Sequence, residues 1–166
     1  PAHPGSQGRD FGQVFGPLYP FGHGLSYTTF KYTHLRLTPE LQNLPATTVI
    51  VTADITNTGT RAGDEVVQLY LRDDYSSVTT YDKALRGFAR VSLAPGETKP
   101  VTFTLGRAEL ALYNRERQWA VEPGRFTVGL GASSEDIRLQ GSFTLAAPDG
   151  RVPDEAPVKD DHFDPR

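Results

Sequence analysis

The chain has 166 residues and a formal net charge of −3, from 17 basic and 20 acidic side chains. A chain of this length fits one domain with a hydrophobic core of its own. The charge balance provides no basic surface for a nucleic-acid backbone, and no apolar run reaches the roughly 18 to 20 residues that span a bilayer. We therefore expect neither nucleic acid nor a membrane among its partners.

Gly and Pro are abundant, whereas Cys and Met are absent. The 16 glycines and 13 prolines exceed the roughly 20 expected for a chain of this length, which favours many turns over long helices. Without cysteine there are no disulfides and no thiolate chemistry. Because the chain starts at Pro1, we expect it to be a piece of a longer polypeptide.

Residues 1–30 are predicted to form an extended N-terminal arm. Residues 1–16 mix Pro, Gly and polar residues without a period, and residues 17–30 (PLYPFGHGLSYTTF) concentrate aromatic side chains. A buried aromatic side chain removes ~150 to 250 Å² from water, so an aromatic run outside the core needs another surface to cover it. The alternative is that the run folds back on its own domain. The predicted interdomain docking residues are Leu18, Tyr19, Phe21, His23 and Tyr27, within a run that also holds Phe15, Pro20 and Phe30.

The Gly22-His23-Gly24 motif in this arm does not match a known catalytic or phosphate-binding pattern. Tyr27 occupies the place of the third glycine of a phosphate-binding GxGxxG loop, and Ser26 is not followed by the glycine of a nucleophile elbow. His23 is therefore expected to be structural, with a place at the rim of an active site as the alternative.

Residues 31–145 alternate apolar and polar side chains in short segments separated by turn residues, which is typical of a two-sheet sandwich. We predict an all-β, immunoglobulin or fibronectin type III-like β-sandwich of about seven strands, with an irregularity at Gly87, a tight turn at 94–97 and one short helical turn within 106–116. The predicted inward-facing residues are Val49, Val51, Ala53 and Ile55; Val67, Leu69 and Leu71; Val101, Phe103 and Leu105; Phe126, Val128 and Leu130; and Ile137, Leu139, Phe143 and Leu145.

Residues 146–166 (AAPDGRVPDEAPVKDDHFDPR) are predicted to be an acidic, Pro-rich tail. Asp160, Asp161, His162 and Asp164 are of the residue types that bind divalent cations. No predicted strand or helix fixes these side chains relative to one another, so we expect no metal site there.

Two pairs of adjacent carboxylates, Asp64-Glu65 and Asp73-Asp74, are of the residue types that perform acid/base chemistry. Neighbours on a strand face opposite sides of the sheet, so neither pair is expected to point into one site. We expect all four to be turn and rim residues.

The only tryptophan of the chain, Trp119, is expected to lie in the core. The alternative is that Trp119, Tyr113 and Tyr70 form a platform on which a sugar ring stacks, as in a carbohydrate-binding module.

Several motifs in order give the chain a resemblance to one family. These are PLYPFGHGLSYTTF, TADITNTGTRAGDEVVQLYLRD, KALRGFARVSLAPGETKPVTFTL and WAVEPGRFTVGLGASSEDIRL. Together they cover roughly residues 15–145, and the chain resembles the C-terminal fibronectin type III-like domain of family 3 glycoside hydrolases. In that family the nucleophile lies on a barrel domain and the acid/base on an α/β sandwich domain, both upstream of the first motif. No position here matches either one.

The resemblance implies a non-catalytic accessory domain that braces the catalytic barrel and the α/β sandwich domain of a parent enzyme. The parent would be a retaining β-glucosidase or β-xylosidase acting on β-linked glucosides, with no cofactor, in the periplasm or secreted. The alternatives are an independent carbohydrate-binding module and a portion of an intact β-glycosidase.

Overall fold

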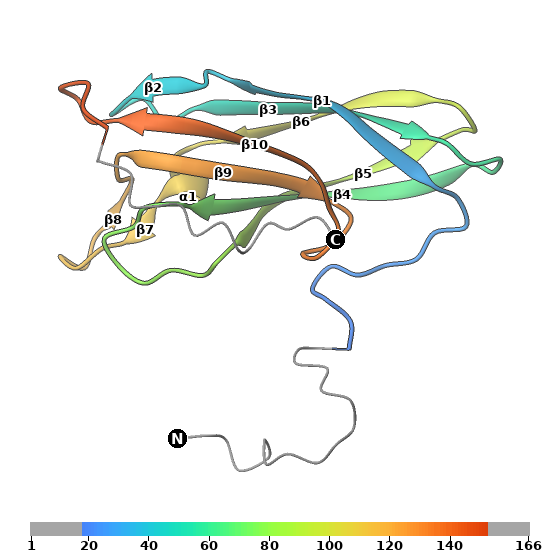
Figure 1. Ribbon diagram of the computed structural model, residues 1–166, viewed down its shortest axis with the longest axis horizontal. Coiled ribbons are helices and arrows are strands. Elements are labelled where there is room, and N and C mark those ends of the chain that lie inside the picture. The colour runs from blue at the N-terminus through green and yellow to red at the C-terminus, as the bar shows by residue number, and fades with distance from the viewer. Residues whose placement is uncertain (1–17, 153–166) are drawn as a thin grey trace, which may run out of the picture.

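The computed structural model describes residues 18–152 and forms the expected all-β sandwich (Figure 1). Phe15 and the acidic residues 160–164 lie outside the described residues. Seven strands have eight residues or more, in agreement with the predicted number. They are β1 (Phe30–Thr38), β3 (Val49–Asn57), β4 (Gly63–Asp73), β5 (Ala84–Leu93), β6 (Thr98–Leu105), β9 (Gly124–Gly131) and β10 (Ile137–Ala146).

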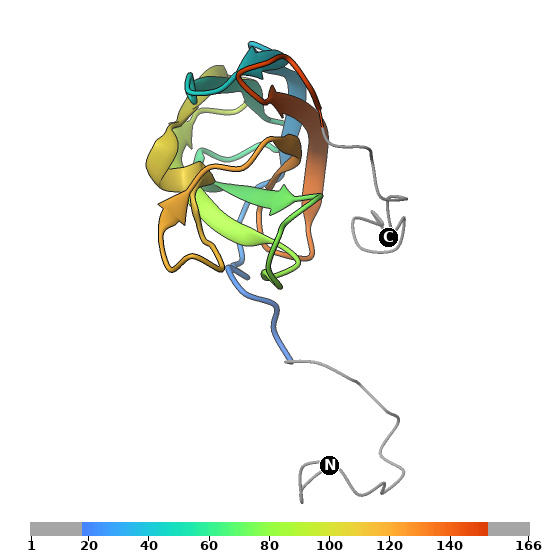
Figure 2. The same ribbon diagram turned by 90° about the vertical axis from the view of Figure 1, so that its left-hand side faces the viewer.

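The strands form two facing layers, which Figure 2 shows nearly end-on. One sheet has the order β1-β3-β6 and the other β2-β10-β9-β4-β5, where β2 is the short strand Leu41–Asn43. A separate two-stranded hairpin joins β7 (Leu112–Tyr113) to β8 (Trp119–Ala120), after the short helix α1 (Arg107–Leu110). The helix lies within the predicted segment 106–116.

The core lies between the two sheets, and the alternation of apolar residues fills it. All the predicted inward-facing residues are buried except Ile137 and Leu139, which are half-buried at the start of β10. The rings of Phe126 and Phe143 stack at a centroid distance of 5.3 Å. Burial of apolar area at about 25 cal/mol per Å² is the main stabilising contribution to such a domain.

Local irregularities agree with the sequence signals. The register between β4 and β5 shifts where Leu69 pairs with Gly87 and Tyr70 pairs with Leu85. A Cβ atom at Gly87 would approach Phe103 Cδ1 to 2.9 Å, so only glycine fits against the opposite sheet. In the 94–97 turn, Gly96 has φ +75° and the Glu97 N–H donates to the Ala94 carbonyl at 3.0 Å.

The chain enters the sandwich at one end and β10 finishes at the other. Phe30 at the start of β1 pairs with Asn57, whereas Ala146 at the end of β10 pairs with Asn43 of β2. We call these the arm end and the hairpin end, because the β7–β8 hairpin lies at the second one (Figure 1).

Candidate docking site

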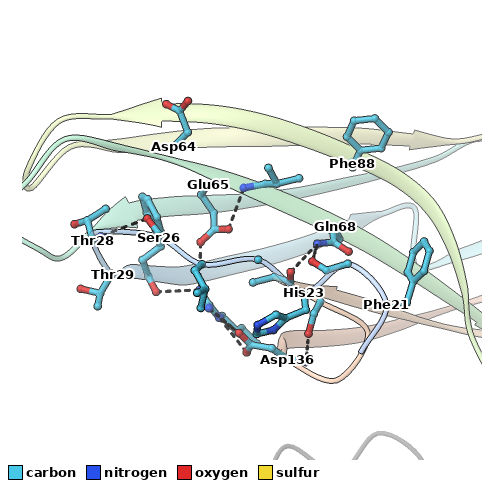
Figure 3. A pocket seen from close by; sticks show the side chains of 18 of the residues that line it. Phe21, His23, Ser26, Thr28, Thr29, Asp64, Glu65, Gln68, Phe88 and Asp136 are labelled. Carbon is cyan, nitrogen blue, oxygen red and sulfur yellow. Dashed lines mark hydrogen bonds and ion pairs between the residues drawn. The ribbon is translucent and has the colours of Figure 1, made fainter. Parts of the chain in front are cut away.

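The described part of the arm, residues 18–29, lies against the outer face of the five-stranded sheet and is held there through its backbone. The Gln68 Nε2 amide donates to the carbonyls of Gly22 at 2.9 Å and Ala132 at 2.6 Å (Figure 3). The Ser134 N–H donates to the Phe21 carbonyl at 2.9 Å. One side chain of β4 thus joins the arm to the loop between β9 and β10.

Tyr70 completes this first attachment. Its hydroxyl donates to Gln68 Oε1 at 2.6 Å, and burial raises the pKa of this phenol, with a further contribution from Glu135. Gln68 and Tyr70 point away from the core, yet both are buried. Gly22 has φ +79°, and a Cβ there would lie only 2.0 Å from Gln68 Oε1, so a side chain at this position would force the arm away from β4.

A second attachment holds the arm where it enters β1. The Thr28 hydroxyl donates to Asn57 Oδ1 at 2.7 Å, and Asn57 Nδ2 donates to the Leu93 carbonyl at 3.0 Å. The Thr58 N–H donates to the Thr29 carbonyl at 2.8 Å. Asn57 is fully buried, so loss of its amide would leave several buried polar groups without partners.

A charge cluster lies beside the second attachment. Arg138 pairs with Asp136 at 2.7 Å and with Glu65 at 3.6 Å, and its Nη1 donates to the Phe30 carbonyl at 3.2 Å. Its guanidinium lies 4.8 Å from the ring centroid of Tyr32. Burial raises the pKa of the Glu65 carboxyl, and the charge of Arg138 opposes that shift.

The expectation for the adjacent carboxylates was right about direction and partly wrong about location. Asp64 faces outward and accepts from Arg90, whereas Glu65 is buried on the other side of β4. The Asp74 carboxylate is also mostly buried, where it accepts from Arg72 at 2.7 Å and from the Thr127 hydroxyl at 2.7 Å. Because they are buried, Glu65 and Asp74 are not rim residues. Each has hydrogen-bond or ion-pair partners that compensate the burial of its charge.

The large apolar side chains of the arm are exposed, although its backbone and the Thr28 hydroxyl bond to the domain. Tyr19 and His23 stack at a centroid distance of 5.2 Å, and the arm and the sheet together line a groove of about 670 Å³. Phe88 of β5 lines this groove and is itself exposed (Figure 3). The exposed apolar side chains are Leu18 at 83%, Tyr19 at 65%, Phe21 at 64%, Leu25 at 93% and Tyr27 at 95%.

The structure places all five predicted docking residues in the described arm with exposed side chains, whereas Pro20 and Phe30 are half-buried. Docking itself stays a prediction. The predicted site residues did not include Gln68 and Asn57, which bond to the arm, or Arg138, which bonds to the Phe30 carbonyl beside it. Asn57 carried a signal, since it ends a strand just before Thr58-Gly59, where Asn commonly bonds its own backbone.

The expectation for Trp119 is wrong. Trp119 is 66% exposed and pairs with Tyr113 on the β7–β8 hairpin, outside both main sheets. Tyr70 is buried beneath the arm, where its hydroxyl donates to Gln68, and it belongs to no platform with these two residues. Among residues 18–152 no group of His, Asp and Glu has the arrangement of a metal site, and no helix there is long and apolar enough to cross a membrane.

Comparison with known proteins shows which family of domains this chain resembles. The family model described as "Fibronectin type III-like domain" matches residues 65–134. A β-xylosidase of Formosa agariphila is 54% identical over 122 residues, which cover 72% of this chain and 16% of that protein. A GH3 β-glucosidase structure from Bifidobacterium adolescentis matches with a TM-score of 0.70 and 37% identity, over 76% of this chain and 18% of that one. The chain contains a fibronectin type III-like domain, and it resembles that domain of family 3 glycoside hydrolases.

Further relatives agree with this assignment of the fibronectin type III-like domain. A periplasmic β-glucosidase of Salmonella typhimurium is 42% identical over 82% of this chain and 18% of its own length. The Trichoderma reesei β-D-glucoside glucohydrolase structure matches with a TM-score of 0.74 and 37% identity, over 80% of this chain and 21% of that one. The chain thus spans about a fifth of the length of these relatives, as an accessory domain does.

Proposed function

We propose that this fibronectin type III-like domain braces the catalytic part of a family 3 glycoside hydrolase, and that the exposed side chains of its arm form the contact. The observation that carries the proposal is the orientation of the arm. The Gly22 carbonyl accepts from the buried Gln68 and the Thr28 hydroxyl donates to the buried Asn57, while the large apolar side chains of the arm are exposed. Contiguous exposed apolar side chains on an ordered segment are typical of a contact surface.

The parent enzyme is proposed to be a β-glucosidase or β-xylosidase, and the partners of the arm are its barrel and α/β sandwich domains. The relatives that support this proposal carry those two activities in their names. The periplasmic β-glucosidase among them favours a location outside the cytoplasm, periplasmic or secreted. The chain itself is proposed to be non-catalytic, because the family's two catalytic carboxylates precede the segment that it matches.

A chimera tests the contact. This chain would replace the matching segment of the Formosa agariphila β-xylosidase, and Tyr19 and Phe21 would be changed to Ala together. We expect the double variant to lose about 2–5 kcal/mol of stability in the chimera, since buried aromatic side chains cost that much when truncated. Heat inactivation of the xylosidase activity measures the effect.

The control for the chimera is Leu41→Ala, which truncates an exposed apolar side chain at the hairpin end and is expected to leave heat inactivation unchanged. An arm double variant as heat-stable as the unmodified chimera would contradict docking by these side chains. The non-catalytic proposal is tested separately. The isolated chain should release no nitrophenol from nitrophenyl β-glucoside or β-xyloside.

A further inference from the structure

The β7–β8 hairpin presents an aromatic pair at the end of the sandwich opposite the arm. Tyr113 and Trp119 are direct cross-strand partners, with ring centroids 5.6 Å apart and ring planes at 59°. Trp119 is 66% exposed and Tyr113 is 52% exposed, and nothing in residues 18–152 covers them. Neither ring contributes to the core, so their exposure needs another explanation.

Hydrogen bonds hold this hairpin in one conformation. The Asn114 N–H donates to the Gln118 carbonyl at 3.0 Å, and the Gln118 N–H donates back to Asn114 Oδ1 at 3.0 Å. Arg107 Nη2 donates to the Trp119 carbonyl at 3.1 Å. The backbone that carries the two rings is therefore ordered before any ligand arrives, which lowers the entropy cost of binding.

A hollow of about 410 Å³ lies beside these rings, within the size range of small-molecule sites. Apolar side chains of the core and of α1 line it, together with polar side chains of the end of β4, of the segment after it and of β5. The apolar ones include Leu71, Leu110 and Phe126, and the polar ones include Asp73, Thr80 and Arg86. Tyr81, 87% exposed, is a third aromatic side chain on its wall.

Asp73 has an unusual place in this hollow. It continues the alternate row of Val67, Leu69 and Leu71, so its carboxyl lies where the apolar inner face of β4 opens to the hollow. It accepts from the Tyr75 N–H at 3.2 Å, and burial raises its pKa to about 7, with smaller contributions from Glu122 and Asp74. A carboxyl with a shifted pKa in a cleft is typical of a functional site.

A pyranose unit fits this combination of groups. Its C–H face is flat and apolar, and its rim of hydroxyl groups both donates and accepts hydrogen bonds. We propose that the hollow binds one pyranose ring of an oligosaccharide, stacked on Trp119 and hydrogen-bonded by Asp73 and Arg86. Tyr113 and Tyr81 border the ring. This site is separate from the arm, and it does not depend on the bracing function.

The polar groups distinguish this ligand from others. An apolar protein surface over the hollow would bury the carboxyl of Asp73 and the guanidinium of Arg86 without hydrogen-bond partners from the covering surface, which is costly. An anionic ligand such as phosphate would meet the carboxylates of Asp73 and Glu109. A neutral polyhydroxylated ring can bond to both a carboxyl and a guanidinium and also cover the exposed aromatic rings.

The test uses the 166-residue chain, in which Trp119 is the only tryptophan, so its emission reports on this site alone. Cellohexaose and xylohexaose would be titrated in parallel with calorimetry. We expect a saturable change with a dissociation constant of about 1 mM or below for at least one of them. Sorbitol, which carries hydroxyl groups but no ring face, is expected to give no saturable change.

Variants locate the site. Trp119→Ala and Tyr113→Ala should each weaken calorimetric binding at least tenfold, and their thermal unfolding shows that they remain folded. Tyr27→Ala removes an exposed aromatic side chain from the arm and should leave binding unchanged.

The proposal is overturned if neither hexaose gives saturable binding, if sorbitol binds equally well, or if folded Trp119→Ala binds as tightly as the unmodified chain. A Trp119 emission that changes with protein concentration alone would also overturn it, by showing that a second copy covers the ring.

Discussion

In the middle of β4 both faces of the strand are buried, but by different means. On the inner face Val67, Leu69 and Leu71 pack against the side chains of the opposite sheet. On the outer face Gln68 and Tyr70 are covered by the backbone of the arm and bond to its carbonyl groups. The inner face is thus buried by apolar packing, whereas the outer face is buried by a segment that hydrogen-bonds to it. The comparison explains how the arm is ordered while its side chains remain available for another surface.

The largest effect is expected on the inner face. Phe126→Ala removes a fully buried ring that stacks on Phe143, and we expect a loss of about 3–5 kcal/mol in the free energy of unfolding. Urea denaturation measures it. Phe88→Ala, which truncates an exposed ring of the outer face, is the control and should cost less than ~0.5 kcal/mol. Equal losses would mean that the outer face is packed as the inner one is.

The next effect concerns Asp73, at the open end of the inner row. Its folded-state pKa of about 7 exceeds the ordinary 3.8, so the folded chain holds this proton more tightly. The resulting stability is complete below pH 3.8 and is lost as the pH rises to about 7, by ~4 kcal/mol at most. Asp73→Asn should remove this slope and raise the free energy of unfolding above pH 7 by ~1–3 kcal/mol.

Urea denaturation across this pH range tests the Asp73 prediction. Asp149→Asn, at an exposed carboxylate that pairs with Arg151, is the control and should keep the slope. If Asp73→Asn keeps it too, the carboxyl is better solvated than its position in the inner row indicates.

A smaller effect is expected on the outer face, from two neighbouring glycines. Gly22→Ala combines a left-handed backbone with a Cβ that would collide with Gln68, and we expect a loss of ~1–2 kcal/mol. Gly24→Ala has open space around the new methyl group and should be near neutral. Amide hydrogen exchange at Ser134 should accelerate only in the first variant, because its N–H bonds to the Phe21 carbonyl. Similar behaviour of both would argue against an arm held at Gly22.

The smallest effect is expected for the exposed side chains of the arm. In the isolated chain, Tyr19→Ala with Phe21→Ala should change the free energy of unfolding by less than ~0.5 kcal/mol, because both rings face solvent. The same double variant destabilises the chimera if the arm docks. A large loss in the isolated chain, measured by thermal unfolding, would place these rings inside their own domain.

The inner face was predictable from sequence because a strand with one buried face has a strict period of two. Val49, Val51, Ala53 and Ile55 show this period in nine consecutive residues of β3, and each is buried. The outer cover was not predictable in the same way. Gln68 and Tyr70 occupy positions that the alternation assigns to solvent, and the arm and the β9–β10 loop cover them.

Trp119 shows a second limit of the sequence pattern. Its large apolar ring favours burial on average, but the two-residue strands β7 and β8 stand outside both sheets. Neither their short length nor the turn residues around them reveal whether such a hairpin folds over the core or away from it. The burial of Asp73 was not predictable either. The period of two predicts the face of β4 to which its side chain points, but not whether the end of the strand is buried.

Entry at the start of β1 and exit at the end of β10 have a mechanical consequence. The two strands lie side by side and run in the same direction for about 30 Å, the length of nine or ten residues. A tensile load applied between the arm and Ala146 would act along the strand axes. The ladder hydrogen bonds would then be sheared together rather than opened one after another, so this domain should resist stretching between its arm and Ala146.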